Sequence, residues 1–211
     1  MKPALVVIAK APAPGRVKTR LCPPCTPRQA AQLAWAALED TLAACSEATC
    51  AGRRVIALDG EPGTWLPAGW DVVAQRGDGL ALRLAHAFED VGVPAFVIGI
   101  DTPQLTAAQL DEALAALERA DAVFGPAMDG GYWGLGLREH EPAVFAGVPM
   151  SRADTGAVQR SRLRELGLRT AELPRLVDVD EIADARAVAV EAPASRFAAA
   201  LAALEPSLAA L

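Results

Sequence analysis

Four cationic side chains lie close together in a Pro-rich segment near the start of the chain: Lys10, Arg16, Lys18 and Arg20. Gly15 stands among them and lets the backbone turn toward a ligand. Residues 1–38 hold no acidic side chain that could neutralise these charges. The segment lacks the G-x-x-x-x-G-K-[ST] and G-x-G-x-x-G spacings, so it is neither a P-loop nor a dinucleotide fingerprint. A solvated basic loop is the alternative, but we expect phosphate binding.

Carboxylates follow two apolar segments later in the chain. Asp101 comes directly after the apolar run 95–100, where it is well placed to hold a divalent cation. Mg²⁺ takes one or two carboxylates and completes its shell with water and substrate phosphates. In the segment 177–180 the alternation of side chains places Asp178 and Asp180 on one side, so either is a candidate second ligand. The alternative is that Asp180 or Glu181 begins the last helix.

A glycine pair adjoins the only tyrosine of the chain, in the sequence Asp129-Gly130-Gly131-Tyr132. An ordinary hairpin turn explains Asp-Gly-Gly equally well. However, two glycines also let backbone amides approach a ligand closely. Ser151 opens a further segment that could cap a helix or contact an acceptor. Gln75 and Gly79 lie in a segment whose amide and glycines could read the edge of a base.

The elements that must position these residues alternate between strand and helix. Short apolar runs predict strands at 3–9, 54–58, 71–74, 95–100, 122–124, 133–137, 169–173 and 177–180. Helices are predicted from an N-cap at Thr26 to about residue 44, over 80–91, from Thr106, over 152–166 and after residue 180. This alternation predicts an α/β fold, with a mostly parallel sheet between helices and ligands at the carboxyl ends of the strands. No linker stands out, so we expect residues 1–211 to form one domain.

Composition narrows the class of protein. The 211 residues are 52% hydrophobic and 22% charged, which argues against disorder. A formal charge of −6 argues against binding a nucleic-acid polymer. No signal peptide or membrane-spanning run is recognisable, so we expect a cytoplasmic protein without a membrane partner.

Four segments together resemble the bacterial DUF2064 family of glycosyltransferase-A-like proteins, which is related to 2-phospholactate guanylyltransferase. They are Ala9–Leu21 (AKAPAPGRVKTRL), Gly99–Leu105 (GIDTPQL), Gly125–Leu137 (GPAMDGGYWGLGL) and Val177–Asp184 (VDVDEIAD). The fold that this resemblance implies is the three-layer α/β/α sandwich of the GT-A, or nucleotide-diphospho-sugar transferase, type.

The resemblance also implies roles for individual residues. The nucleotide would contact Ala9, Lys10, Gly15, Arg16, Lys18, Arg20, Gln75 and Gly79. Mg²⁺ or Mn²⁺ would bind Asp101 together with Asp178 or Asp180. The acceptor would contact Asp129, Gly130, Gly131, Tyr132 and Ser151. Arg16, Lys18 and Asp101 would act in catalysis.

The implied reaction is transfer of a nucleoside monophosphate from a nucleoside triphosphate to a small phosphorylated acceptor, with release of pyrophosphate. An alternative is glycosyl transfer from a nucleotide-diphospho-sugar, for which Asp129 would be the base. We expect no second carboxylate near Asp129, and this favours nucleotidyl transfer. A non-catalytic nucleotide-binding module is a third alternative. Base preference, acceptor identity and oligomeric state stay open at the level of sequence.

Overall fold

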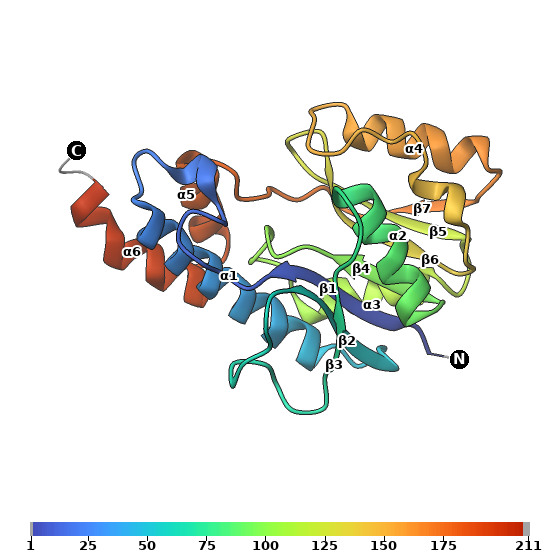
Figure 1. The fold of residues 1–211 in the computed structure, drawn as a ribbon, viewed down its shortest axis with the longest axis horizontal. Coiled ribbons are helices and arrows are strands. Elements are labelled where there is room, and N and C mark those ends of the chain that lie inside the picture. Colours follow the sequence, from blue (N-terminus) through green and yellow to red (C-terminus); the bar gives the residue numbers. More distant parts are fainter. Residues whose placement is uncertain (1, 209–211) are drawn as a thin grey trace.

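The structure, a computed structural model, describes residues 2–208. Its seven strands form one sheet in the order β3-β2-β1-β4-β6-β5-β7 (Figure 1). β6 pairs antiparallel with β4 and β5, and the other four pairings are parallel. The strands are β1 (Ala4–Lys10), β2 (Arg53–Asp59), β3 (Asp71–Ala74), β4 (Ala95–Ile98), β5 (Ala122–Pro126), β6 (Tyr132–Leu137) and β7 (Thr170–Glu172). The predicted mostly parallel α/β fold is confirmed.

Helices cover both faces of this sheet. They are α1 (Pro27–Glu47), α2 (Leu80–Val91), α3 (Ala107–Ala116), α4 (Thr155–Glu165), α5 (Ile182–Glu191) and α6 (Arg196–Leu208), with short 3-10 turns at Thr19–Leu21 and Pro142–Phe145. α1 and α3 pack on one face, and α2 and α4 pack on the other. Among residues 2–208, none of the helices is both long enough and apolar enough to cross a membrane.

β1 shows why the sheet is covered on both sides. Leu5 and Val7 are fully buried on the side of α1 and α3. Val6, between them, is fully buried on the other side, in the cluster that contains Phe88 of α2. Because successive side chains of a strand point to opposite faces, a continuous apolar run needs cover on both. Each fully buried aliphatic side chain contributes about 1.5–3 kcal/mol to folding.

The starts of two helices agree with the predicted caps. Thr26 precedes α1 and forms a capping box with Gln29, while Pro27 occupies the first turn. Thr106 precedes α3 and forms the same reciprocal pair with Gln109. Each cap satisfies backbone N–H groups that the helix leaves unpaired, which stabilises the fold by about 1 kcal/mol.

The last two helices anchor the basic loop. Away from the sheet, α6 packs against α1 and α5 packs against α6 (Figure 1), and Phe197 and Leu201 of α6 join Leu21 and Leu33 in a third apolar cluster. Leu21 ends the basic loop and is fully buried there. The C-terminal region therefore fixes the end of the cationic loop and brings the segment 177–180 beside it.

The strand predicted at 177–180 is wrong. This segment contains no regular strand, and the nearest pairing is an isolated bridge between Ala127 and Leu176. The main chain of Val179 bonds instead to the carbonyl of Asp101 and to the side chain of Lys18. Val177 accepts from the side chain of Gln104. Because loop groups and side chains satisfy these backbone atoms, no neighbouring strand is needed.

Candidate functional site

Two adjoining pockets open near the carboxyl ends of β1 and β4. The first, of about 350 Å³, lies beside the basic loop. The second, of about 670 Å³, lies beside the segments around Asp129 and Ser151. Leu80, Asp101 and Tyr132 line both pockets. The position agrees with the rule that α/β sheets bind ligands at the carboxyl ends of their strands.

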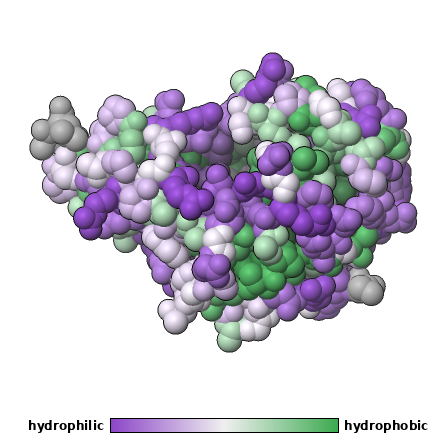
Figure 2. Space-filling model, viewed as in Figure 1, coloured by the Kyte–Doolittle hydropathy of each residue, from purple (hydrophilic) through white to green (hydrophobic). Residues whose placement is uncertain are grey.

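The first pocket combines cations with an apolar wall. Predicted nucleotide residues in its lining are Ala9, Lys10, Arg16, Lys18 and Gln75. Apolar side chains from β1, α2, β4 and β6 form the rest, including Ile8, Leu80, Leu84, Val97 and Leu135. Figure 2 shows a hydrophobic area over β1 and β2 on a face that is otherwise largely hydrophilic. An apolar slot bordered by cations suits a ligand that is flat at one end and anionic at the other.

Lys18 turns inward from the basic loop. Its backbone is left-handed, with φ of 48°, which costs a residue with a side chain about 1–2 kcal/mol. Only 6% of its side chain is exposed, and Nζ lies 2.5 Å from Oδ1 of Asp101. Nζ also donates to the carbonyl oxygen of Val179. Lys18 therefore joins the basic loop, the turn after β4 and the segment before α5.

The other loop residues divide between the pockets. Arg16 is 69% exposed and lies 3.9 Å from the carboxylate of Asp59, so its guanidinium is available to a ligand. Arg20 lines the second pocket rather than the first and lies 2.5 Å from Asp180. Gly15 has φ of +77°, with open space where a Cβ would stand, so the turn itself requires glycine. The structure therefore places Arg20 on the side expected for the acceptor.

Both polar atoms of the Gln75 side chain form hydrogen bonds within the protein. Nε2 donates to the carbonyls of Ala9 (2.8 Å) and Ala57 (2.9 Å), and Oε1 accepts from Arg83 (3.1 Å). Arg83 also donates to Asp59 at 2.9 Å, and this bond holds the pKa of Asp59 below its usual range. The amide thus ties β1 to β2 at the pocket edge, and base contact by Gln75 stays a prediction. Gly79, with φ of +82°, immediately precedes α2 and lies outside the lining of both pockets.

Carboxylates dominate the second pocket. Asp129, Asp178 and Asp180 each offer an oxygen, and these oxygens all lie within 4.8 Å of one another. Asp101 lines the same pocket, but its carboxylate pairs with Lys18. The resemblance predicts a metal group of Asp101 with Asp178 or Asp180. The structure instead brings both Asp178 and Asp180 to Asp129, a predicted acceptor residue.

Burial and neighbouring carboxylates make the carboxyl of Asp178 a weaker acid. Burial raises the pKa of its carboxyl to about 6, and the negative charge of Asp129 adds to this effect. Asp180 and Asp101 act in the same direction. Like charges at such distances disfavour ionisation, and a divalent cation would relieve the repulsion. The expectation that Asp129 has no carboxylate neighbour is therefore wrong.

Gly130 and Gly156 allow the turn at Asp129 to lie close to the start of α4. The amide of Gly156 donates to the carbonyl of Gly130 at 2.8 Å. A Cβ on Gly130 would lie 1.9 Å from the carbonyl oxygen of Ala153. The Asp129 carboxylate accepts from the amide of Gly131 at 2.7 Å, which closes the turn. Close backbone approach therefore requires glycine at position 130.

Tyr132 and Ser151 line the same pocket as this turn. The Tyr132 hydroxyl donates to Sδ of Met150, and burial raises its pKa. Ser151 has φ of 60°, an unfavourable value for a residue with a side chain. Of the predicted acceptor residues, Asp129, Gly131, Tyr132 and Ser151 reach the pocket lining, and Gly130 supports the turn from outside it.

Sequence reasoning missed Arg83 and Gln104. Arg83 is the only charged residue among the first six of α2, which is a detectable signal beside a strand-end loop. Gln104 directly follows the Asp101-Thr102-Pro103 turn, but nothing in its spacing indicates its buried bond to Val177.

Solved structures share this fold. A candidate nucleotide-diphospho-sugar transferase from Desulfovibrio desulfuricans G20 is 27% identical, with a TM-score of 0.88 over 98% of this chain and 96% of that one. CMP:2-keto-3-deoxy-manno-octonic acid synthetase, solved with CTP, is 14% identical, with a TM-score of 0.60 over 92% and 99% of the two chains. Rv0371c of Mycobacterium tuberculosis H37Rv, solved with manganese, is 21% identical, with a TM-score of 0.51 over 89% and 97%.

Sequence comparison gives the family. No curated protein matches the chain significantly. Residues 29–152, more than half of the chain, match the family described as "Uncharacterized protein conserved in bacteria (DUF2064)". The match includes the segments Gly99–Leu105 and Gly125–Leu137, on which part of the resemblance rests. The chain therefore belongs to the DUF2064 family.

Proposed function

We propose that the chain is a metal-dependent nucleotidyltransferase that moves a nucleoside monophosphate from a triphosphate to a small phosphorylated acceptor. One observation carries the proposal: a cationic pocket and a carboxylate-lined pocket meet at Asp101. In this arrangement the donor phosphates would lie between Lys18 on one side and the aspartates on the other. A non-catalytic binding module would have no need for the second pocket.

The donor fits the first pocket. A nucleoside would occupy the apolar part near Leu80 and Leu84, and the phosphates would face Lys10, Arg16 and Lys18. Charge-assisted bonds to phosphate oxygens are roughly twice as strong as neutral ones. The fold is compatible with such a ligand, because the synthetase named above holds CTP.

The carboxylates fit a divalent cation. Mg²⁺ and Mn²⁺ prefer oxygen ligands, and the three clustered oxygens of Asp129, Asp178 and Asp180 require only small movements to surround one ion. Arg20 pairs with Asp180, but Asp178 stands among the like charges of Asp129, Asp180 and Asp101, which together with burial raise its pKa. A bound cation would neutralise charge on phosphate oxygens during transfer. The mycobacterial structure of the same fold was solved in complex with manganese, which supports this assignment.

The protein's own groups then have limited chemistry to perform. An oxygen of the acceptor phosphate forms a bond to the α-phosphorus, and the bond from that phosphorus to pyrophosphate breaks. The phosphate nucleophile is already ionised, so no general base is required. Arg16 and Lys18 would stabilise the charge that develops on the departing oxygens, and the second pocket would orient the acceptor.

Glycosyl transfer is the second candidate, and two observations favour it. The carboxyl of Asp178, with a pKa of about 6 beside Asp129, suits a base that activates a hydroxyl acceptor. The Desulfovibrio protein is also described as a candidate nucleotide-diphospho-sugar transferase. A cation on the three aspartates would occupy this base, so metal binding at the cluster favours nucleotidyl transfer.

Product analysis tests the proposal. The protein is mixed with nucleoside triphosphates or nucleotide sugars, Mg²⁺ or Mn²⁺, and a panel of sugar phosphates and phosphorylated hydroxy acids. Nucleotidyl transfer releases pyrophosphate from a triphosphate, whereas glycosyl transfer releases a nucleoside diphosphate from a nucleotide sugar. EDTA and the variant Asp180→Asn should both suppress the release of pyrophosphate. Product formation that persists in EDTA would contradict the metal-dependent chemistry.

A further inference from the structure

We propose that Gln104 is a positioning residue, whose side-chain amide holds the segment 177–180 so that Asp178 and Asp180 face Asp129. This inference rests on the proposed function, because it concerns the carboxylates that we expect to bind the cation. Gln104 lines neither pocket, so its effect must pass through the backbone that it contacts.

The orientation of the Gln104 amide is fixed by one strong contact. The residue is 7% exposed, and Nε2 donates to the carbonyl oxygen of Val177 at 2.6 Å. Rotating the amide by 180° would bring its oxygen against that carbonyl, which is repulsive. Among residues 2–208, Oε1 finds no hydrogen-bond partner. A buried oxygen without a partner costs about 1–3 kcal/mol, so an apolar residue would serve packing better.

Two neighbouring contacts act on the same segment. The amide of Val179 donates to the carbonyl of Asp101 at 2.7 Å, and Lys18 donates to the carbonyl of Val179. Val177 and Val179 turn their side chains into the third apolar cluster. Asp178 and Asp180, which alternate with them, line the second pocket. Bonds to the backbone of the two valines therefore set where both carboxylates stand.

Fixing this backbone matters because the carboxylates repel one another. Arg20 pairs with Asp180, but before a cation binds, the like charges of Asp129 and Asp178 still favour separation of the segment from the Asp129 turn. A backbone held by Gln104 keeps the oxygens together before the cation arrives. Groups that orient metal ligands typically change metal affinity about 10–100-fold when they are removed.

The test replaces Gln104 by a side chain of similar length that has no donor. Gln104→Met is compared with Gln159→Met, because Gln159 is a second buried glutamine with the same bonding pattern. Its Nε2 donates to the carbonyl of Val144 at 2.9 Å, and its Oε1 is likewise without a partner. Both variants lose one amide–carbonyl bond, and only Gln104→Met loses a bond to the segment 177–180. Gln104→Leu repeats the test if Gln104→Met does not fold.

Mn²⁺ affinity is measured by calorimetry, and thermal unfolding reports global stability. Gln104→Met should raise the Kd for Mn²⁺ by about tenfold or more, while Gln159→Met stays within about twofold of the wild type. Equal Mn²⁺ affinity in the two variants would overturn the inference and leave the proposed function standing.

Amide hydrogen exchange at Val179 in metal-free protein separates the two proposals. Gln104→Met should lower the protection of this amide by about tenfold, with protection in β4 unchanged. If the wild type binds no Mn²⁺, the metal-dependent function fails, and this exchange rate alone decides the role of Gln104. Unchanged protection of the Val179 amide in Gln104→Met would then overturn the positioning role of Gln104.

Discussion

Nζ of Lys18 lies 2.5 Å from Oδ1 of Asp101 and also donates to the carbonyl of Val179. The cation predicted to bind phosphate is thus already the counter-ion of a carboxylate predicted to bind a metal. The lysine side chain is 6% exposed and that of the aspartate 55% exposed, so the pair lies at the inner wall of the site with its acidic side toward solvent. Ligands entering the two pockets meet at this pair.

Replacing Lys18 tests its part in donor binding. Lys18→Met should weaken binding of a nucleoside triphosphate by about tenfold or more, because a buried charge-assisted donor to phosphate is lost. Lys2→Met is the control, since Lys2 is an exposed lysine that bonds only to the carbonyl of Thr49 in the described structure. Calorimetry measures both affinities, and equal values would remove Lys18 from the donor site.

The carboxyl of Asp178 predicts a pH dependence of stability in EDTA. Its pKa is about 6 in the folded chain, against roughly 3.9 in an unfolded one, so folding favours the protonated form. This contribution to stability is present below about pH 4 and is lost as the pH rises through 6. Asp178→Asn should therefore be more stable than the wild type at pH 7, by about 1–2 kcal/mol after allowance for solvent screening. Urea unfolding at pH 4 and pH 7 should show the advantage shrinking at the lower pH.

Gly130 provides a test of the Asp129 turn. Gly130→Ala should destabilise the fold by more than about 2 kcal/mol, since a Cβ would collide with the carbonyl of Ala153 at a positive φ. Gly147→Ala is the matched control, because its φ of +74° is similar and its Cβ would meet open space. That control should cost only about 1 kcal/mol. Similar losses in both variants, measured by urea unfolding, would mean that contact with Ala153 is unimportant.

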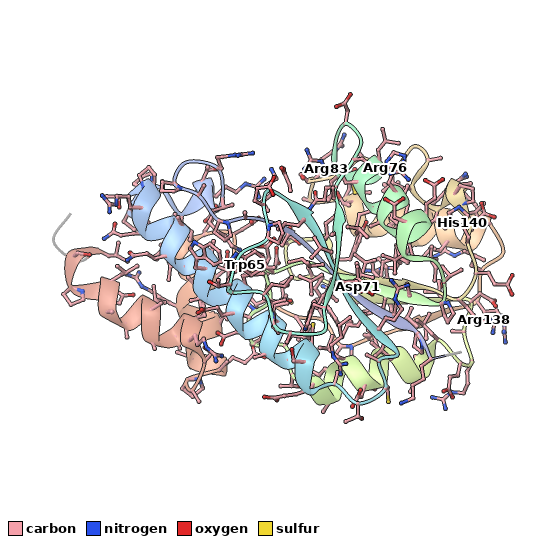
Figure 3. All side chains as sticks on the ribbon, turned by 60° about the horizontal axis from the view of Figure 1, so that its bottom comes forward. Trp65, Asp71, Arg76, Arg83, Arg138 and His140 are labelled. Atoms are coloured by element: carbon pink, nitrogen blue, oxygen red, sulfur yellow. The ribbon has the colours of Figure 1, made fainter. Side chains whose placement is uncertain are left out.

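Arg83 is expected to act on the donor pocket through Gln75. Arg83→Met removes the donor that fixes Oε1 of Gln75, and we expect nucleotide affinity to fall about three- to tenfold. Arg76→Met is the control: Arg76 lies on the same side of the molecule as Arg83 (Figure 3) but bonds to Glu89 and Asp90. Fluorescence titration with a labelled nucleotide should distinguish the two variants. A fall of equal size in both would point to general loss of positive charge.

Local rules predicted much of the fold. The caps at Thr26 and Thr106 depend on hydroxyl side chains next to a helix start, and both lie where expected. The strand at residues 4–10 depends on an apolar run buried on both faces. These features involve neighbours in sequence, so the sequence alone indicates them.

The features that the sequence did not predict depend on contacts between segments that lie far apart in the chain. The segment 177–180 reads as a strand, yet its backbone is satisfied by Asp101, Gln104 and Lys18 from elsewhere in the chain. The approach of Asp129 to Asp178 depends in the same way on how two loops meet. Spacing along the chain carries no information on such meetings, so the sequence indicated Asp129, Asp178 and Asp180 as candidates but not that they lie together.

Calorimetry with a panel of nucleoside triphosphates and nucleotide sugars, in the presence of Mg²⁺ or Mn²⁺ and again in EDTA, tests the central claim most directly. We predict that at least one nucleotide binds with the metal and that its affinity falls at least about tenfold in EDTA. Absence of binding to every nucleotide, with and without metal, would contradict the proposal that the two pockets form a nucleotide and metal site.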